Sequence, residues 1–400
     1  MRQIQTTPQS AGLIIILAAL VAFGPLSIDM YLPSLTMITD DLGADIREIK
    51  QTITFFLVGF SVGMFFYGPL SDRFGRRKLL FTGMIVYIVA TIGCIFAASG
   101  TELFIARLAQ ALGGASASVL ARAIVRDLYS VQDSARILSW MHTITMIATL
   151  IAPILGSYLA DFFGWRSIFV FLLIFAGLTA LVSFINIKET LPEEARIESL
   201  PQALTSYFEI LKNRRAIGYI GCMGMAFAGM FVYITASPFV YIEHFGVTSQ
   251  HYALLFGLNI FSIMAMTIFN ARQVRTLDPQ KMIAFGATTV LGSSLFMLVV
   301  HLMIDIPLSL VVLGLFFFVG MTGLLSANCI AKLMGLFPKK QAGAAAGLAV
   351  SVQFGLGGLL SFIVSQSKSA SPAAMIYLIA CAGLLSFLAM MMTKEPATSN

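Results

Sequence analysis

The sequence predicts an all-α integral membrane protein of twelve transmembrane helices in two six-helix bundles. Hydrophobic residues make up 58% of the 400 residues and charged residues only 11%, whereas about a quarter of the residues of a soluble domain are charged. Uncharged runs close to the roughly 20 apolar residues that cross a bilayer recur along the chain. One long polar connector leaves six such runs on each side. The short loops between the other runs could not shield twelve apolar helices from water.

The uncharged runs define the spans. Ten spans carry no charge, whereas 11–33 contains Asp29 and 102–121 contains Arg107, with Glu102 at its edge. We therefore expect an N-terminal bundle over residues 1–187 and a C-terminal bundle over residues 216–400, an organisation typical of transporters built from repeats. The ten uncharged spans are 52–71, 79–101, 137–160, 167–187, 216–242, 252–271, 282–304, 306–331, 341–367 and 369–393.

Residues 188–215, KETLPEEARIESLPQALTSYFEILKNRR, form the polar connector. We expect a cytoplasmic linker here, with a short amphipathic helix on the inner membrane surface. Ser199 is a suitable N-cap and Pro201 fits the first turn. The apolar positions that would share one face at helical spacing are Leu200, Leu204, Phe208 and Leu211.

The distribution of cations predicts the orientation. With the N-terminus inside, the cytoplasmic segments hold 20 Lys and Arg residues and the outer segments hold four. The positive-inside rule then places both termini in the cytoplasm. The net charge of +6 is explained by this topology, so we expect no nucleic-acid partner. The four outer cations are Arg47, Lys50, Arg166 and Lys368.

Several other functions are disfavoured by missing patterns. The four cysteines lie inside spans without a CxxC pair, so neither a disulfide framework nor a metal site is expected. No GxxxxGK[ST] loop is present, so ATP is not the expected energy source. No catalytic constellation lies at membrane depth, which argues against an enzyme. The first apolar run lacks a small-residue cleavage site, and we interpret it as a span and not a signal peptide.

The loop after the second span, GPLSDRFGRRKLL (68–80), is rich in cations. These cations alone fit a positive-inside anchor. The segment also resembles the G-x-x-x-D-R-x-G-R signature of the major facilitator superfamily. The matching residues, in order, are Gly68, Asp72, Arg73, Gly75 and Arg76.

This resemblance implies a cytoplasmic gate. In the family, the acid and the arginines form a latch that closes the inner side of the outward-open state. Carried over here, Asp72 would contact the N-terminal end of span 341–367, where the helix dipole favours an anion. The arginines Arg73, Arg76 and Arg77 would be the candidates to pair with Asp127.

Two further segments resemble superfamily patterns. LFIARLAQALGGA (103–115) is similar to L-x-x-x-R-x-x-Q-G-x-G, with Ala111 in place of one glycine. APILGSYL (152–159) is similar to the exporter pattern G-P-x-x-G-G and keeps Pro153 and Gly156, while Ala and Ser replace two of its glycines. The second similarity favours efflux over uptake. The residues that match the first pattern are Leu103, Arg107, Gln110 and Gly113.

Three more segments resemble the bicyclomycin-resistance (Bcr/CflA) subgroup of drug:proton antiporters: SIDMYLP (27–33), ASPFVYIEHFG (236–246) and MTIFNARQVR (266–275). The resemblance runs from the first span to the last. It implies alternating-access export of small amphipathic drugs, such as bicyclomycin, phenicols or sulfonamides. Protons would drive the export without a cofactor, in a monomer of the bacterial inner membrane. Export of an amino-acid-like metabolite, or uptake by symport on the same fold, remains open.

Asp29 and Arg107 are the charges that lie well within spans. A charge at the centre of a span costs about 2.5–3.5 kcal/mol, so such residues usually face a cavity and serve a function. At about 1.5 Å per residue, we expect both to lie about 6–9 Å from the outer surface. We interpret Asp29 as the group that loads and releases a proton as Arg107 moves nearer or farther. The alternative is a static ion pair, or two residues that line a wet pore.

The resemblance to the superfamily implies that the first, fourth, seventh and tenth spans surround the centre, so polar and aromatic residues of these spans, and of the second, eighth and eleventh, would line the substrate cavity. Each polar side chain could instead hydrogen-bond a neighbouring helix. An apolar, aromatic cavity with few polar groups would suit a small amphipathic molecule. The candidates are Tyr31, Phe55, Gln110, Tyr233, Asn259, Asn328 and Gln353.

Overall fold

The computed structural model describes residues 8–195, 207–274 and 276–393. These residues contain twelve helical stretches that are long and apolar enough to cross a membrane, which confirms the all-α membrane fold. The first half comprises α1 (Pro8–Asp29), η1 (Leu32–Ser34), α2 (Leu35–Leu42), α3 (Ile46–Phe74), α4 (Arg76–Phe96), α5 (Gly100–Leu128), α6 (Val131–Phe163), α7 (Arg166–Asn186) and η2 (Glu193–Ala195). The second half comprises α9 (Arg214–Pro238), the π-helix η3 (Phe239–His244), α10 (Ser249–Gln273), α11 (Pro279–Met303), α12 (Leu308–Gly335), α13 (Lys339–Ser365) and α14 (Ala373–Met391).

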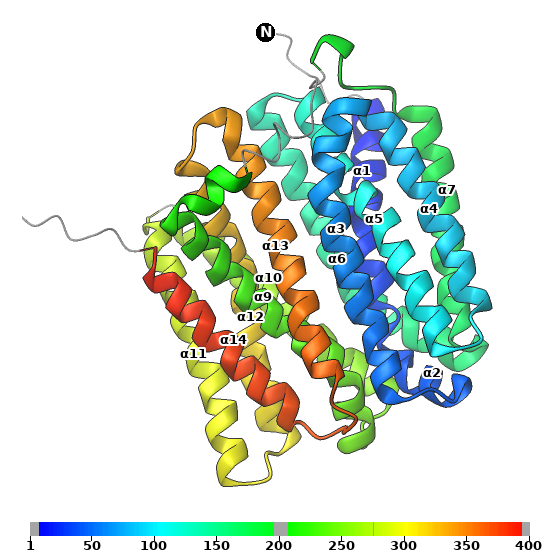
Figure 1. The fold of residues 1–400 in the computed structure, drawn as a ribbon, viewed down its shortest axis with the longest axis vertical. Helices are drawn as coiled ribbons and strands as arrows, with labels where there is room; N and C mark the ends of the chain where they lie inside the picture. The colour runs from blue at the N-terminus through cyan, green and yellow to red at the C-terminus, as the bar shows by residue number, and fades with distance from the viewer. Residues whose placement is uncertain (1–7, 196–206, 275, 394–400) are drawn as a thin grey trace, which may run out of the picture.

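The helices form two groups that follow the chain order (Figure 1). In the first half, α5 packs against α3, α4 and α1, while α4 also packs against α7. In the second half, α9 packs against α12, α13 and α14, and α11 packs against α12 and α14. The two groups meet where α3 lies along α13 and where α6 lies along α10.

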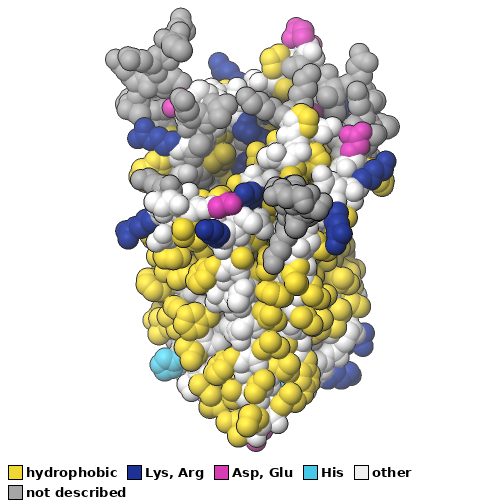
Figure 2. All heavy atoms as spheres, turned by 90° about the vertical axis from the view of Figure 1, so that its left-hand side faces the viewer, with side chains coloured by type: hydrophobic (Ala, Val, Ile, Leu, Met, Phe, Trp, Pro, Cys, Tyr) yellow, Lys and Arg dark blue, Asp and Glu magenta, His cyan; other side chains and the backbone are white. Residues whose placement is uncertain are grey.

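We name the ends of the molecule after the predicted orientation. The inner end carries the loop between α3 and α4, and the outer end carries α2; they lie at the top and bottom of Figure 1. Figure 2 shows hydrophobic side chains covering the middle and lower part of the face formed by the second group. The charged side chains on this face gather mainly toward the inner end (Figure 2). This distribution is what a bilayer would select, since charge is costly in its core.

Helices α3 and α13 run antiparallel, and polar contacts join them from their middles to the outer end. Ser61 Oγ donates to the carbonyl of Ser351 at 2.9 Å. Nearer the outer end, the hydroxyls of Thr54 and Ser361 are 2.8 Å apart. Ser361 also lies 2.7 Å from the hydroxyl of Thr235 on α9. Small hydroxyl side chains therefore let the helices of the two groups approach closely.

The first spans of the two halves are both irregular near their outer ends. The first span is interrupted after Asp29 and continues through η1 and α2 to Leu42, whereas the sequence predicted an end near residue 33. In the second half, α9 passes into the π-helix η3. The irregular segments face each other across the two groups, since η1 contacts α9 and α10 and α2 contacts η3. Interrupted helices at corresponding places in two repeats are typical of transporter binding sites.

The described parts of the linker are residues 188–195, which include η2, and residues 207–215, which contain a short helical turn over 207–212. The ring of Tyr207 packs 5.0 Å from that of Phe65 on α3, and Ile210 is fully buried. Phe208 and Leu211 are exposed on the other side. The predicted cap and first apolar positions, Ser199, Leu200, Pro201 and Leu204, lie outside the described residues.

Candidate functional site

Asp29 lies at the interruption of the first span. It is the last residue of α1, and a turn through Met30 and Tyr31 follows before η1. The residue is only 5% exposed, and Thr149 of α6 lies within hydrogen-bonding range of its carboxylate.

Asp29 also lies at the contact between the two bundles. It is within Coulombic range of the hydroxyls of Tyr233 and Tyr252, which belong to α9 and α10 of the other bundle. The element that directly follows Asp29, η1, contacts both of these helices. A change in the charge of Asp29 would therefore change its electrostatic interaction with the opposite bundle.

The residues opposite Asp29 form an aromatic group that we call the tyrosine cluster: Tyr233, Tyr241, Tyr252, Phe256 and Asn259. The rings of Tyr233 and Phe256 stack at 6.0 Å, and those of Tyr241 and Tyr252 lie 5.9 Å apart. Asn259 Nδ2 donates to Tyr233 Oη at 2.9 Å. Within the described chain, Tyr241 Oη and Asn259 Oδ1 are buried without a hydrogen-bond partner. Such groups are costly unless a ligand or water satisfies them, so the tyrosine cluster offers hydrogen bonds to a bound molecule.

Arg107 lies in a cage of aromatic rings inside the N-terminal bundle. Its guanidinium carbon is 4.7 Å from the ring centre of Tyr31, 4.3 Å from that of Phe56 and 5.8 Å from that of Phe169. The residue is fully buried, and Nη1 donates to Gln110 Oε1 at 2.6 Å. Cation–π contacts of this kind are strongest when the cation is removed from water, so the rings partly offset the burial of the charge.

Asp29 and Arg107 do not pair with each other. The ion pairs of the described chain do not include one between these residues. The static ion pair that the sequence allowed is therefore absent from this conformation. Tyr31 links them instead, since it follows Asp29 by two residues and its ring covers Arg107.

Three substrate candidates of the N-terminal bundle have their described partners within that bundle. The hydroxyl of Tyr31 is 2.9 Å from Thr52 Oγ1. Gln110 accepts from Arg107 and donates to Thr91 Oγ1 at 2.8 Å. Phe55 stacks on Phe104 at 4.7 Å. These contacts are the alternative that the sequence left open for polar side chains, and the ring that covers Arg107 belongs to Phe56, one position along α3.

The candidates of the C-terminal bundle divide into two groups. Asn328 Nδ2 donates to Asn270 Oδ1 at 2.6 Å, and Gln353 Nε2 donates to Ser326 Oγ at 2.9 Å. These two residues connect neighbouring helices of their own bundle, which is the alternative that the sequence left open. Tyr233 and Asn259 hydrogen-bond each other near Asp29, so they are the two candidates that the structure brings to the site.

The loop between α3 and α4 forms a chain of charges at the inner end. Gly75 joins the two helices with a φ of 93°, a conformation that favours glycine. Arg76 pairs with Asp72 at 2.6 Å and, through Nε, with Asp127 at 3.0 Å. Thr190 Oγ1 donates to the same Asp127 carboxylate at 2.9 Å. The loop is thereby fastened to α5 and to the start of the linker.

The other predicted gate residues have different partners. Among the described residues, Asp72 pairs with Arg76 in this conformation. Arg73 stacks over Phe74 at 5.1 Å, and Arg77 Nη2 donates to the carbonyl of Phe184 at 3.1 Å. The carbonyl of Gly68 accepts from Ser71 Oγ at 2.8 Å.

The predicted exporter motif packs against the interruption of the first span. Pro153 and Gly156 lie within α6, beside α1. A methyl group on Gly156 would overlap the carbonyl oxygen of Met30 and lie 2.8 Å from its Cα. Only glycine lets α6 approach the residue that follows Asp29 so closely. The motif therefore shapes the surroundings of Asp29.

Lys50 is a buried charge that the sequence analysis missed, because it assigned this residue to an outer segment. Helix α3 begins at Ile46, and Lys50 is only 2% exposed. Its ammonium donates to the carbonyl of Ser367 at 3.0 Å and lies 5.1 Å from the ring centre of Phe239. Both partners belong to the C-terminal bundle, so Lys50 joins the bundles at the outer end. Lys50 lies within REIKQTITFF, directly before an apolar run, and this position could have indicated that it belongs to the helix.

Glu189 is a second residue that the sequence analysis missed. Its carboxylate accepts the backbone N–H groups of Arg76 and Arg77 at 2.9 and 3.2 Å and so caps α4. Partial burial opposes ionisation, but backbone N–H donors, chiefly those of Leu191, Arg76 and Arg77, hold the pKa of Glu189 below its usual range.

Known proteins resemble the whole chain. The model of the Major Facilitator Superfamily matches residues 15–362. The bicyclomycin resistance protein homolog of Haemophilus influenzae is 30% identical over 377 residues, which cover 94% of each chain. The multidrug resistance protein MdtL of Klebsiella pneumoniae is 28% identical over 277 residues, covering 69% of this chain and 70% of MdtL.

A solved structure agrees with this fold. A D-xylose–proton symporter superposes with a TM-score of 0.72 at 18% identity, covering 94% of this chain and 96% of the symporter. At that identity the likeness shows the fold alone. The family match and the Haemophilus relative, which both extend over most of the sequence, confirm the resemblance seen in the motifs. The chain therefore belongs to the bicyclomycin-resistance (Bcr/CflA) subgroup of the major facilitator superfamily, and it is a transporter and not an enzyme.

Proposed function

We propose that this protein exports small amphipathic drugs, such as bicyclomycin, phenicols or sulfonamides, in exchange for protons. The observation that carries the proposal is the position of Asp29, a buried carboxyl group at an interrupted helix, within Coulombic range of the opposite bundle. Relatives named for bicyclomycin resistance and multidrug resistance support the choice of substrates. The protein would act as a monomer in the bacterial inner membrane, with both termini in the cytoplasm.

Asp29 would carry the proton. A carboxyl group in an apolar site prefers its neutral form, whereas hydrogen bonds and water favour the ionised form. Rocking of one bundle against the other would move the tyrosine cluster relative to Asp29, while Thr149 stays in the same bundle. The two conformations would therefore bind the proton with different affinity, which is the condition for coupling. Arg107 would act on Asp29 through Tyr31 and not through a direct ion pair.

The tyrosine cluster would bind the drug. Its rings offer apolar stacking surfaces, and Tyr241 Oη and Asn259 Oδ1 offer hydrogen bonds that the described protein leaves unused. This combination suits a molecule with an aromatic body and a few polar groups. Protonation of Asp29 would remove the negative charge beside the site as the drug leaves.

The residues of the inner loop would serve as the gate. Arg76 connects Asp72 with Asp127 in this conformation. In the alternate state, Asp72 would turn to the N-terminal end of α13, whose dipole attracts an anion. By exchanging partners, Asp72 would let the inner ends of α3 and α13 separate in one conformation and come together in the other.

The proton gradient supplies enough energy for export. One proton that moves through about 100 mV releases about 2.3 kcal/mol. At about 1.36 kcal/mol per tenfold ratio, this supports a nearly 50-fold concentration gradient of the drug.

Transport by the purified protein in liposomes tests the proposal. The lumen is made one pH unit more acidic than the medium, and a panel of bicyclomycin, a phenicol, a sulfonamide and an amino acid is added outside. We expect at least one drug to accumulate about tenfold per exchanged proton, with a matching rise of the luminal pH. Accumulation only with an alkaline lumen would identify a symporter. Accumulation of the amino acid alone would replace drugs by metabolites as the substrate class.

A further inference from the structure

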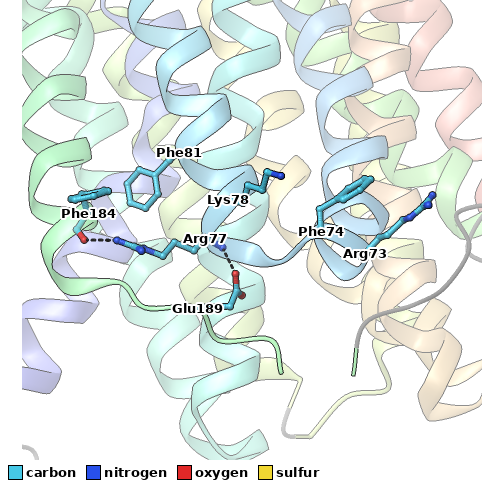
Figure 3. Close-up of a pocket in the computed structure, with 7 residues that line it drawn as sticks. All are labelled: Arg73, Phe74, Arg77, Lys78, Phe81, Phe184 and Glu189. Atoms are coloured by element: carbon cyan, nitrogen blue, oxygen red, sulfur yellow. Dashed lines mark hydrogen bonds between the residues drawn. The ribbon is translucent and has the colours of Figure 1, made fainter. Parts of the chain in front are cut away.

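A basic hollow lies at the inner end of the N-terminal bundle, away from the tyrosine cluster. It has a volume of about 560 Å³ and lies between the end of α3, the start of α4 and the end of α7. Figure 3 shows Arg77 extended toward Phe184, while Lys78, Phe74 and Arg73 reach the other way in this view. The lining residues are Arg73, Phe74, Arg77, Lys78, Phe81, Phe184 and Glu189.

The cations of this hollow keep donors for a ligand, although Arg77 Nη2 already donates to the carbonyl of Phe184 at 3.1 Å. Among the described ion pairs, none involves Arg73, Arg77 or Lys78. Arg77 Nε is buried and has no hydrogen-bond partner in the described chain. The carboxylate of Glu189 accepts the backbone N–H of Arg77. Backbone hydrogen bonds of this kind lower the pKa of Glu189. The carboxylate therefore caps the start of α4 and does not pair with the Arg77 guanidinium. Three positive charges therefore face a single acid that is already engaged.

From the hollow toward the middle of the membrane-spanning helices, the surface becomes apolar. On α4, Ile85 and Val89 continue the helical face that begins with Lys78, since they follow at intervals of seven and four residues. Both are well exposed, at 61% and 62%. On the adjacent α7, Leu181 and Phe184 are also exposed. A basic hollow next to two exposed apolar helix faces is complementary to a phospholipid with a negatively charged headgroup and apolar chains. Basic pockets between membrane helices on the cytoplasmic side bind such headgroups.

We propose that this hollow binds the phosphate headgroup of an anionic phospholipid of the inner leaflet, whose acyl chains lie along α4 and α7. Arg77 and Lys78 contact the phosphate. The rings of Phe81 and Phe184, which already flank the Arg77 guanidinium at 5.6 and 4.8 Å, border the glycerol region. The charge of the three cations selects anionic over zwitterionic lipid.

Lipid binding to the purified full chain tests this proposal. The protein is titrated in a neutral detergent with phosphatidylglycerol or phosphatidylcholine of identical acyl chains, and bound lipid is counted by native mass spectrometry. We expect phosphatidylglycerol to bind at least tenfold more tightly. In the double variant Arg77→Gln/Lys78→Gln, its affinity falls about 30-fold, since each basic residue near an anionic lipid contributes about fivefold.

The matched control removes the same charge at the inner end of the other bundle. The double variant Arg272→Gln/Lys281→Gln changes two exposed cations of α10 and α11, and we expect less than a threefold effect. If the Arg77 variant does not fold, as judged by size-exclusion chromatography, Arg73→Gln/Lys78→Gln removes two exposed cations of the same hollow.

Three results would overturn the proposal. The first is equal affinity for the two lipids. The second is an equal loss of affinity in the pocket and control variants, which would indicate general attraction by the basic inner end. The third is full displacement of phosphatidylglycerol by millimolar glycerol 3-phosphate, which would make a soluble phosphate the ligand in place of a lipid.

Discussion

Asp29 and Arg107 are both buried in the N-terminal bundle, but their surroundings are opposite. Asp29 lies at a helix interruption, directly before the η1 turn region that contacts α9 and α10 of the other bundle. Arg107 is enclosed by Tyr31, Phe56 and Phe169, all from its own bundle. A group that exchanges a proton between two sides must sense the relative movement of the bundles, and rigid-body rocking changes only the surroundings of Asp29. Burial of a charge is therefore insufficient to identify a coupling residue.

Replacing Asp29 should have the largest effect on transport. We expect Asp29→Asn to fold normally and to exchange drug down its gradient, but to lose accumulation against it, from about tenfold per pH unit to none. The measurement is drug uptake into liposomes with an acidic lumen. Asp40→Asn, which changes an exposed acid of α2, is the control and should keep full accumulation. Undiminished uphill transport by Asp29→Asn would remove Asp29 from the mechanism.

Gly156→Ala should disturb the surroundings of Asp29 and leave those of Arg107 intact. The added methyl group overlaps the carbonyl of Met30, so α6 must move away from α1 at a cost of about 1–3 kcal/mol. We expect transport to slow about tenfold and the melting temperature to fall by several degrees. Gly177→Ala on α7 is the matched control, because no atom lies within 4 Å of its added methyl group. Equal behaviour of the two alanine variants would show that close packing at Gly156 is unimportant.

Arg107→Lys should have the smallest effect on coupling. Lysine keeps the positive charge but loses the planar group that stacks between the rings, which should lower stability by about 1–2 kcal/mol. We expect a lower melting temperature and a transport rate reduced two- to threefold, with the full drug gradient retained. If the variant kept its stability and lost the gradient, Arg107 would couple directly to Asp29, and the contrast between the two residues would fail.

The sequence located the membrane spans well in their apolar middles and poorly at their ends. Composition reveals a span because a bilayer offers no partners for polar groups, but helices continue past the apolar run into polar sequence. Helix α3 thus begins at Ile46, six residues before the predicted span, and includes Lys50. The first span likewise extends to Leu42. The sequence therefore assigned Lys50 to an outer segment, although this residue lies within a helix.

The sequence predicted which residues belong to the candidate site better than it predicted which of them contact each other. Tyr233 and Asn259 were identified as polar residues of spans that the superfamily resemblance places around the centre, and the structure joins them. Phe55 was chosen where Phe56 faces Arg107, since one step along a helix turns the side chain by about 100°. Periodicity alone did not fix that rotation for α3, because both of its faces are apolar.

The sequence by itself determined that the chain spans a membrane in twelve helices, that six apolar runs lie on each side of a polar connector, and that a segment resembling the superfamily signature lies between α3 and α4. These properties follow from local composition and short motifs. Only the tertiary structure decided which charge meets which partner. Lys50 donates a hydrogen bond to a carbonyl 317 residues away, and η1, just after Asp29, contacts α9 and α10 from the other half of the chain. Such contacts depend on the rotation and tilt of each helix against its neighbours, which packing fixes and local sequence does not.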